Sequence, residues 1–170
     1  MSVSNPLIQM ETDFGEILLE LDIVKAPLSV ENFTNYARSG HYDGTVFHRV
    51  IKGFMIQGGG LTPDMTEKPT REPIASEARN KLRNRTGTIA MARTEDIDSA
   101  RAQFFINTED NRDLDHAGLN PAVYGYAVFG QVVDGMDVVY EIERVAVGNK
   151  EGYENVPMEP VVITRVTVID

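Results

Sequence analysis

The stretch "FHRVIKGFMIQGGG", residues 47–60, holds one His and one Arg, then an apolar run, a Gln and three consecutive glycines. Side chains alternate between the two faces of a β-strand. If "TVFHRV" is a strand, Phe47 and Arg49 share one face, and Val46, His48 and Val50 share the other. The pattern therefore predicts a strand face on which a cation lies next to an aromatic ring.

Two further segments extend this face. In "FMIQ", Met55 and Gln57 share a face, and in "QFFIN", Gln103 and Phe105 do so. If these faces converge, Met55 and Phe105 form an apolar patch with Arg49, Gln57 and Gln103 at its edge. Spacing does not distinguish this patch from a solvated Arg, two surface Gln and core aromatics.

The remaining chain alternates in the same way. "GEILLELD" has the period of a half-buried strand, and "APLSVENFTNYARSG" that of a helix with Ser29 as N-cap, Glu31 in the first turn and Gly40 as its stop. Further strands are expected at "LIQME", "GTIAMAR", "YAVFGQVV" and "VVITRVTVID", and a second helix at "GMDVVYEIERV". Many short strands and long polar loops predict a mainly β fold, a barrel or a sandwich.

Chain length, net charge and apolar content indicate which classes of protein fit this sequence. The 170 residues fit a single domain, 1–170, and carry a net charge of -10, which argues against nucleic-acid binding. The first ten residues lack a signal-peptide pattern, and no stretch approaches the roughly 20 apolar residues of a membrane span. We expect a cytoplasmic protein without a membrane partner, and a monomer.

Several chemistries have no support in the chain. There is no Cys, and His41, His48 and His116 lack metal-ligand spacing, so we expect no metal site. Gly58–Gly60 lack the spacing and Lys of a phosphate loop, and a chain reversal or close backbone approach explains them better. No Ser with an adjacent base is evident, so nucleophilic catalysis has no support. Two carboxylates that act as acid and base stay open, because acidic residues are abundant.

The blocks "FHRVIKGFMIQGGG" and "SARAQFFIN", with "GTIAMAR", "YAVFGQVVDGMDVV" and "KAPLSVENF" in order around them, resemble the cyclophilins, the peptidyl-prolyl cis-trans isomerases. The chain is most similar to the single-domain cytoplasmic cyclophilins of bacteria. The resemblance covers nearly the whole sequence. It implies a closed eight-stranded antiparallel β-barrel capped by two α-helices, with a shallow outer groove that binds X-Pro peptides.

The resemblance also implies roles for individual residues. The catalytic Arg falls on Arg49, and His48 faces away from it as a supporting or purely structural residue. The substrate-binding positions fall on Phe54, Met55, Phe105 and Leu114 for the proline pocket, on Gln57, Ala92 and Arg93 for the substrate backbone, and on Gln103 and Tyr126. Strict alternation would separate Phe54 from Met55, so Phe54 is expected to precede the regular strand.

Two positions depart from the best-known eukaryotic cyclophilins. Their groove Trp falls on Asp113 and their groove His on Tyr126. Loss of the Trp removes an indole donor and a large apolar surface, so we expect cyclosporin to bind weakly at most. Proline-containing polypeptides are the expected partners. The isomerisation that the resemblance implies makes and breaks no covalent bond, so we expect no nucleophile, metal or cofactor.

Two other classes stay open on the sequence. One is a proline-peptide binding module or chaperone that does not catalyse turnover, against which Arg49 speaks. The other is a barrel with a small ligand inside. Bulky inward-facing Ile, Leu, Val and Phe would fill a small barrel, which disfavours it.

Overall fold

The computed structural model describes residues 4–169 and has a mainly β architecture with two α-helices. The strands are β1 (Leu7–Thr12), β2 (Gly15–Leu21), β3 (Thr45–Val46), β4 (Arg49–Ile51), β5 (Met55–Gly58), β6 (Thr88–Met91), β7 (Phe104–Asn107), β8 (Val128–Asp134), β9 (Val147–Lys150), β10 (Tyr153–Pro157) and β11 (Val162–Ile169). The helices are α1 (Pro27–Arg38) and α2 (Met136–Glu143), with a short 3-10 helix at Arg112–Leu114. The expected mainly β fold with two helices is confirmed.

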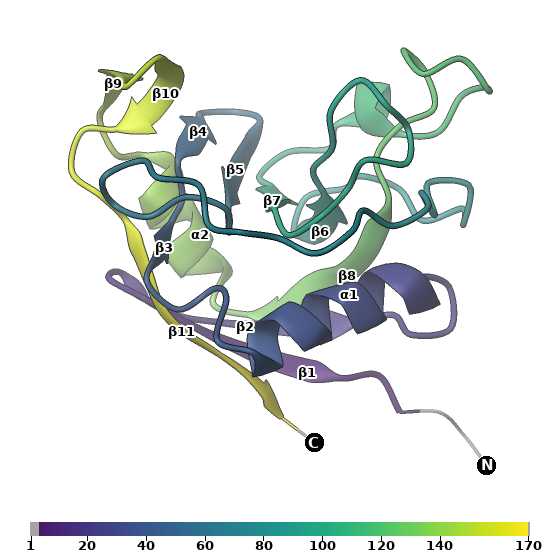
Figure 1. The fold of residues 1–170 in the computed structure, drawn as a ribbon, viewed down its shortest axis with the longest axis horizontal. Coiled ribbons are helices and arrows are strands. Elements are labelled where there is room, and N and C mark those ends of the chain that lie inside the picture. The colour runs from purple at the N-terminus through teal and green to yellow at the C-terminus, as the bar shows by residue number, and fades with distance from the viewer. Residues whose placement is uncertain (1–3, 170) are drawn as a thin grey trace.

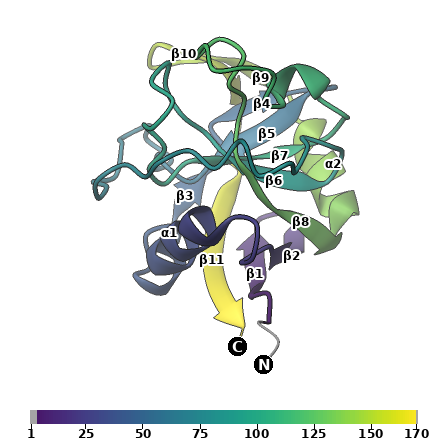
Figure 2. The same ribbon diagram turned by 90° about the vertical axis from the view of Figure 1, so that its right-hand side faces the viewer.

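Nine of these strands form one antiparallel sheet in the order β3-β11-β1-β2-β8-β6-β7-β5-β4. The two edge strands, β3 and β4, are separated in the chain only by Phe47 and His48. The sheet therefore curls back on itself into a half-barrel (Figure 1, Figure 2). A closed eight-stranded barrel describes this arrangement only approximately, because a chain segment rather than a hydrogen-bonded ladder joins the edges.

The main core fills the concave side of the sheet. Ile17, Leu19 and Leu21 of β2 are fully buried, as the alternation of that segment predicts. The Phe33 ring of α1 lies 5.6 Å from that of Phe104 and 5.5 Å from that of Phe129. Bulky side chains thus fill the interior, which argues against an internal ligand.

A second, smaller apolar cluster lies on the other side of strands β5 to β8. Met55, Ala90, Phe105 and Val128 are its buried members. All four residues of β7 are buried, so this strand contributes to both clusters. The two-sided burial gives the outer surface an apolar floor on which a groove can form.

The start of α1 differs from the sequence-based prediction. Ser29 is not its N-cap, and Glu31 is not in its first turn, because the helix begins at Pro27 after Ala26. Proline suits the first helical position, where its missing N–H is not needed. The Glu77 carboxylate instead accepts bonds from the backbone N–H groups of Leu28 and Ser29, at 3.1 and 2.6 Å. Gly40, with φ +77°, follows the helix end as expected.

The segment "TVFHRV" is not one continuous strand, so Phe47 and Arg49 do not share a face. The chain leaves β3 after Val46 and enters β4 at Arg49. Phe47 is fully buried in the main core, whereas Arg49 is exposed. The break lets Phe47 and Val50 both point inward, against strict alternation. The hairpin of β9 and β10 was not expected from the sequence.

Neither α-helix of residues 4–169 has the length and apolar character needed to cross a membrane.

Candidate active site

A groove with a volume of about 200 Å³ lies over the smaller apolar cluster, on the outer face of the sheet. Its lining residues are Arg49, Phe54, Met55, Gln57, Ala92, Arg93, Phe105, Leu114 and Tyr126. They come from β4, β5, β7 and three connecting segments. The structure therefore brings together every substrate-binding candidate except Gln103, together with the catalytic candidate Arg49.

One wall of the groove is built by neighbouring strands. Arg49 pairs with Gln57 across β4 and β5, and Gln57 pairs with Phe105 across β5 and β7. Directly paired residues on adjacent strands have their side chains on the same face. The ladder thus aligns a guanidinium, an amide and an aromatic ring side by side, which confirms that Met55 and Gln57 share a face with Phe105.

Hydrogen bonds orient the polar edge of this wall. Arg49 Nη1 donates to Gln57 Oε1 at 3.3 Å, and Gln57 Nε2 donates to Gln103 Oε1 at 3.0 Å. Gln103 itself lines an adjoining hollow of about 400 Å³ that shares Gln57, Ala92 and Arg93 with the groove. It therefore lies one hydrogen bond away from the groove residues, at the back of Gln57.

The glycines at positions 58 and 60 leave room for the segments that pack beside this polar edge. A Cβ atom at Gly60 would lie 2.5 Å from Gln103 Nε2, and one at Gly58 would lie 2.6 Å from the backbone oxygen of Val46. The backbone contact at Gly58 requires a residue without a side chain, whereas a side chain at Gly60 would displace Gln103. The prediction of a close backbone approach is confirmed.

The apolar floor is made by Met55 and Phe105, which are 1% and 4% exposed. Tyr126 meets the Phe105 ring edge-on, with centroids 5.6 Å apart and an interplanar angle of 81°. Phe54 also faces the groove, although it is adjacent to Met55 in the chain. Its N–H donates to the Ile51 oxygen at 3.1 Å, so it still belongs to a turn, and β5 begins at Met55. The expected irregularity at Phe54 is confirmed.

The second wall is held by Arg93. Its guanidinium donates to the backbone oxygens of Thr94, Pro121 and Gly125 at 2.9, 3.1 and 3.1 Å. The same group lies 4.7 Å from the centroid of the Tyr126 ring. The side chain of Arg93 thus fastens the loop that carries Leu114 and Tyr126 to the groove.

His48 precedes Arg49 in the chain, but its side chain does not line the groove. It is 5% exposed, its ring meets Tyr153 edge-on at 6.0 Å, and its Nδ1 has no hydrogen-bond partner. Burial, and secondarily the Arg49 charge, lowers the pKa of His48 to about 4. The ring is therefore neutral near pH 7 and adds no second positive charge beside Arg49.

Three buried or half-buried asparagines beneath the groove were missed from the sequence: Asn84, Asn107 and Asn111. One signal was available. Asn107 ends "QFFIN" two residues after Phe105, so alternation already places it on the groove face. Among the described residues, no group of three His, Cys, Asp or Glu side chains could hold a metal ion.

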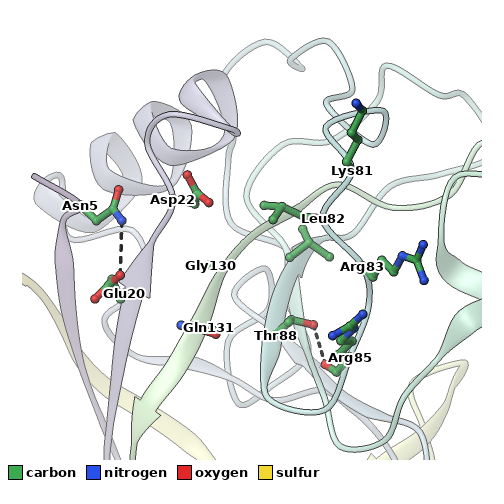
Figure 3. A pocket seen from close by; sticks show the side chains of 11 residues that line it. Asn5, Glu20, Asp22, Lys81, Leu82, Arg83, Arg85, Thr88, Gly130 and Gln131 are labelled. Carbon is green, nitrogen blue, oxygen red and sulfur yellow. Dashed lines mark hydrogen bonds between the residues drawn. The ribbon is translucent and has the colours of Figure 1, made fainter. Parts of the chain in front are cut away.

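A larger hollow, of about 320 Å³, lies elsewhere on the surface (Figure 3). Glu20 and Asp22 stand on one side of it, and Lys81, Arg83 and Arg85 on the other, with Gly130 between them. Charged walls of both signs do not suit an uncharged proline ring. The groove at Arg49 remains the better candidate for the activity that the sequence suggests.

Comparison with known proteins agrees with this choice. The sequence profile of the family described as "Cyclophilin type peptidyl-prolyl cis-trans isomerase/CLD" matches residues 7–168. The chain is 54% identical to the peptidyl-prolyl cis-trans isomerase cyp18 of Streptomyces antibioticus over 95% of its own length and 98% of the relative's. It is 51% identical to peptidyl-prolyl cis-trans isomerase B of Escherichia coli (strain K12), over 95% of this chain and 99% of that protein.

Solved structures show the same fold. A cyclophilin-type peptidyl-prolyl cis-trans isomerase of Cryptosporidium parvum superposes with a TM-score of 0.82 at 26% identity, covering 98% of both chains. A second structure of that protein, in the presence of the dipeptide Ala-Pro, gives a TM-score of 0.81 at 26% identity, covering 96% of this chain and 99% of that one. On its sequence and its fold, this chain belongs to the cyclophilin-type peptidyl-prolyl cis-trans isomerases.

Proposed function

We propose that the groove at Arg49 binds an X-Pro segment and that Arg49 catalyses rotation about the X-Pro peptide bond. The observation that carries this proposal is the position of the Arg49 guanidinium. It lies at the rim of an apolar hollow floored by Met55 and Phe105 and is bonded on one side by Gln57. A proline ring fits such a floor, and its nitrogen then faces the cation.

Isomerisation of an X-Pro bond requires few catalytic groups beyond these. Rotation about a peptide bond has a barrier of about 18–20 kcal/mol because the nitrogen lone pair is delocalised into the carbonyl. Before proline the cis and trans states differ by only about 0.5–1 kcal/mol, so both are populated and exchange is slow. In the twisted state the lone pair returns to nitrogen, which can then accept a hydrogen bond.

A guanidinium aimed at that nitrogen stabilises the twisted state more than the planar one, which is the condition for catalysis. Arginine suits the task because it stays charged and donates in a rigid fork. A hydrogen bond to a charged group contributes about 1.5–3 kcal/mol, whereas a thousandfold acceleration needs about 4 kcal/mol. The groove must supply the difference by holding the ring on its apolar floor, while Gln57 and backbone groups hold the preceding carbonyl.

We propose proline-containing polypeptides, in unfolded or flexible segments, as the substrates. The Ala-Pro dipeptide named with the Cryptosporidium relative supports this class. The cytoplasmic location, the monomeric state and weak cyclosporin binding stay predictions from the sequence. So do the single domain over residues 1–170 and the absence of a cofactor.

The test measures cis-to-trans exchange of a short X-Pro peptide by NMR exchange spectroscopy, in the presence of wild type or Arg49→Ala. We expect rapid exchange with wild type and a loss of at least about tenfold in the variant, equivalent to about 1.4 kcal/mol in the barrier. Arg165→Ala is the matched control, because Arg165 is also an exposed strand arginine but lies on β11, outside the groove. Equal activity of Arg49→Ala and wild type would remove Arg49 from the mechanism. Peptide binding without exchange by wild type would favour a binding module.

A further inference from the structure

A network of hydrogen-bonded asparagine side chains lies beneath the groove. Asn84 and Asn107 are 1% and 0% exposed, and Asn111 is half-buried. Asn107 lies at the end of β7, paired with Met55 of the groove floor. Buried amides are destabilising unless their hydrogen-bonding groups are satisfied, so each bond of this network matters.

The three side chains form a continuous chain of hydrogen bonds. Asn111 Nδ2 donates to Asn107 Oδ1 at 2.8 Å, and Asn107 Nδ2 donates to Asn84 Oδ1 at 3.0 Å. The second proton of Asn107 Nδ2 goes to Thr88 Oγ1, also at 3.0 Å. Only a side chain that donates and accepts at the same time can occupy the middle position.

Both ends of this chain reach the groove. Asn111 Nδ2 donates to the backbone oxygen of Phe54 at 2.9 Å. Asn84 Nδ2 lies 3.0 Å from the backbone oxygen of Leu114 and 3.4 Å from that of Tyr126. The network therefore contacts three residues of the groove lining through their main chains.

These three groove residues have no strand ladder to hold them. Phe54 lies in the turn before β5, Leu114 ends the 3-10 helix, and Tyr126 precedes β8. Their side chains nevertheless close the apolar hollow opposite Arg49. Two main-chain bonds reach the same oxygens, from the Thr108 N–H to Phe54 at 3.0 Å and from the Tyr126 N–H to Leu114 at 2.9 Å. The asparagine network adds side-chain donors to these oxygens.

We propose that Asn84, Asn107 and Asn111 are positioning residues that set the width of the proline pocket through the backbone oxygens of Phe54, Leu114 and Tyr126. The inference rests on the proposed function of the groove. A displacement of about 1 Å at a binding surface can lower a rate by up to about a hundredfold. We therefore expect a loss of kcat/KM in folded variants of the network, although none of its three asparagine side chains lines the groove.

The decisive variants are Asn111→Asp and Asn111→Ala, compared at pH 7.5. Aspartate keeps the size of asparagine but cannot donate, and its ionised oxygens would oppose the Phe54 oxygen and Asn107 Oδ1. Alanine only removes one donor from each of those two acceptors, and the Phe54 oxygen still accepts from the Thr108 N–H at 3.0 Å. Hydrogen-bonded positioning therefore predicts that Asn111→Asp is the more damaging change, whereas a packing role predicts the reverse order.

We expect kcat/KM to fall about tenfold in Asn111→Ala and further in Asn111→Asp, with the NMR amide signals of residues 54, 114 and 126 shifted in both. Asn107→Ala, which breaks the middle of the network, is expected to lose the most. Asn5→Ala is the matched control. The Asn5 side chain also donates a hydrogen bond, to Glu20, and accepts one, from the Ile23 N–H, but it lies outside the groove. It is expected to keep wild-type kcat/KM.

Two results would overturn the inference: wild-type kcat/KM in folded Asn111→Asp, or a milder effect of Asp than of Ala. If Asn107→Ala does not fold, the Asn111 pair still decides the question. Binding of an Ala-Pro-containing peptide, titrated by NMR, separates this inference from the proposed function. If wild type binds without exchange, the catalytic proposal fails, and weaker binding by Asn111→Asp than by Asn111→Ala would still support positioning.

Discussion

The two walls of the groove are built by different means. On one side, Arg49, Gln57 and Phe105 lie on three hydrogen-bonded strands, and cross-strand pairing alone places them next to one another. On the other side, Leu114 and Tyr126 lie outside the strands. Long-range contacts of the Arg93 guanidinium and the Asn84 amide with backbone oxygens hold them in place.

The protein thus combines a rigid strand wall, which carries Arg49, with an irregular loop wall. A strand ladder repeats at fixed intervals, so it suits groups that must be aligned with a bond axis. A loop can follow the outline of a ring but needs separate anchors, because its own backbone groups have no regular partners. We expect the strand wall to depend on core packing and the loop wall on a few polar side chains.

The largest effect is expected at the strand wall, from Phe105→Ala. Phe105 is 4% exposed and belongs to the small apolar cluster, so its loss leaves a cavity in the groove floor. The free energy of unfolding should fall by about 3–5 kcal/mol, and kcat/KM should fall with it. Urea unfolding and peptide exchange measure the two losses.

As a control, Phe14→Ala at a 38% exposed position should lose less than about 1 kcal/mol. Similar losses in the two variants would argue against a packed floor.

The next-largest effect is expected in the pH dependence of stability, through His48. The unfolded chain takes up a proton on His48 near pH 6.5, whereas the folded protein does so only near its pKa of about 4. Stability should therefore fall as pH falls from 6.5 to 4, by about 3 kcal/mol for this group. His48→Phe removes this contribution. Urea unfolding of both proteins at pH 7 and pH 4 should show the smaller decrease in the variant, and parallel decreases would contradict the assignment.

At the loop wall, Arg93→Ala removes three donated hydrogen bonds and the contact with the Tyr126 ring. We expect the free energy of unfolding to fall by about 1–3 kcal/mol and kcat/KM to fall about tenfold, since the loop moves away from the groove. Arg93→Lys keeps the charge but not the planar fork, so it should resemble Arg93→Ala. Wild-type kcat/KM in Arg93→Lys would show that charge alone holds the loop.

The smallest effect is expected from Tyr126→Phe. The Tyr126 ring packs against Phe105 at an interplanar angle of 81° and lies under the Arg93 guanidinium, and no described hydrogen bond uses its hydroxyl. The variant should keep kcat/KM within about twofold of wild type, equivalent to about 0.5 kcal/mol. Tyr126→Ala should show a larger loss in the same peptide-exchange assay. A large loss in Tyr126→Phe would assign the hydroxyl a direct part in binding.

Much of the strand wall could be predicted from local sequence. Alternation placed Met55 with Gln57 and Gln103 with Phe105, and these pairs lie on their expected faces. It failed at Phe47, because the chain breaks its strand there to join the two edges of the sheet. The loop wall could not be predicted from spacing. Leu114 and Tyr126 were placed there only by resemblance to the family.

The start of α1 shows the limit most clearly. The local pattern predicted the helix itself and its stop at Gly40, because apolar spacing and a glycine act over a few residues. The cap came from Glu77, whose carboxylate accepts hydrogen bonds from the backbone N–H groups of Leu28 and Ser29, 49 and 48 residues away in the chain. Patterns of period two and 3.6 are local and can be recognised in a single chain. The partners of unpaired backbone groups, like the asparagines beneath the groove, are chosen by which segments folding brings together.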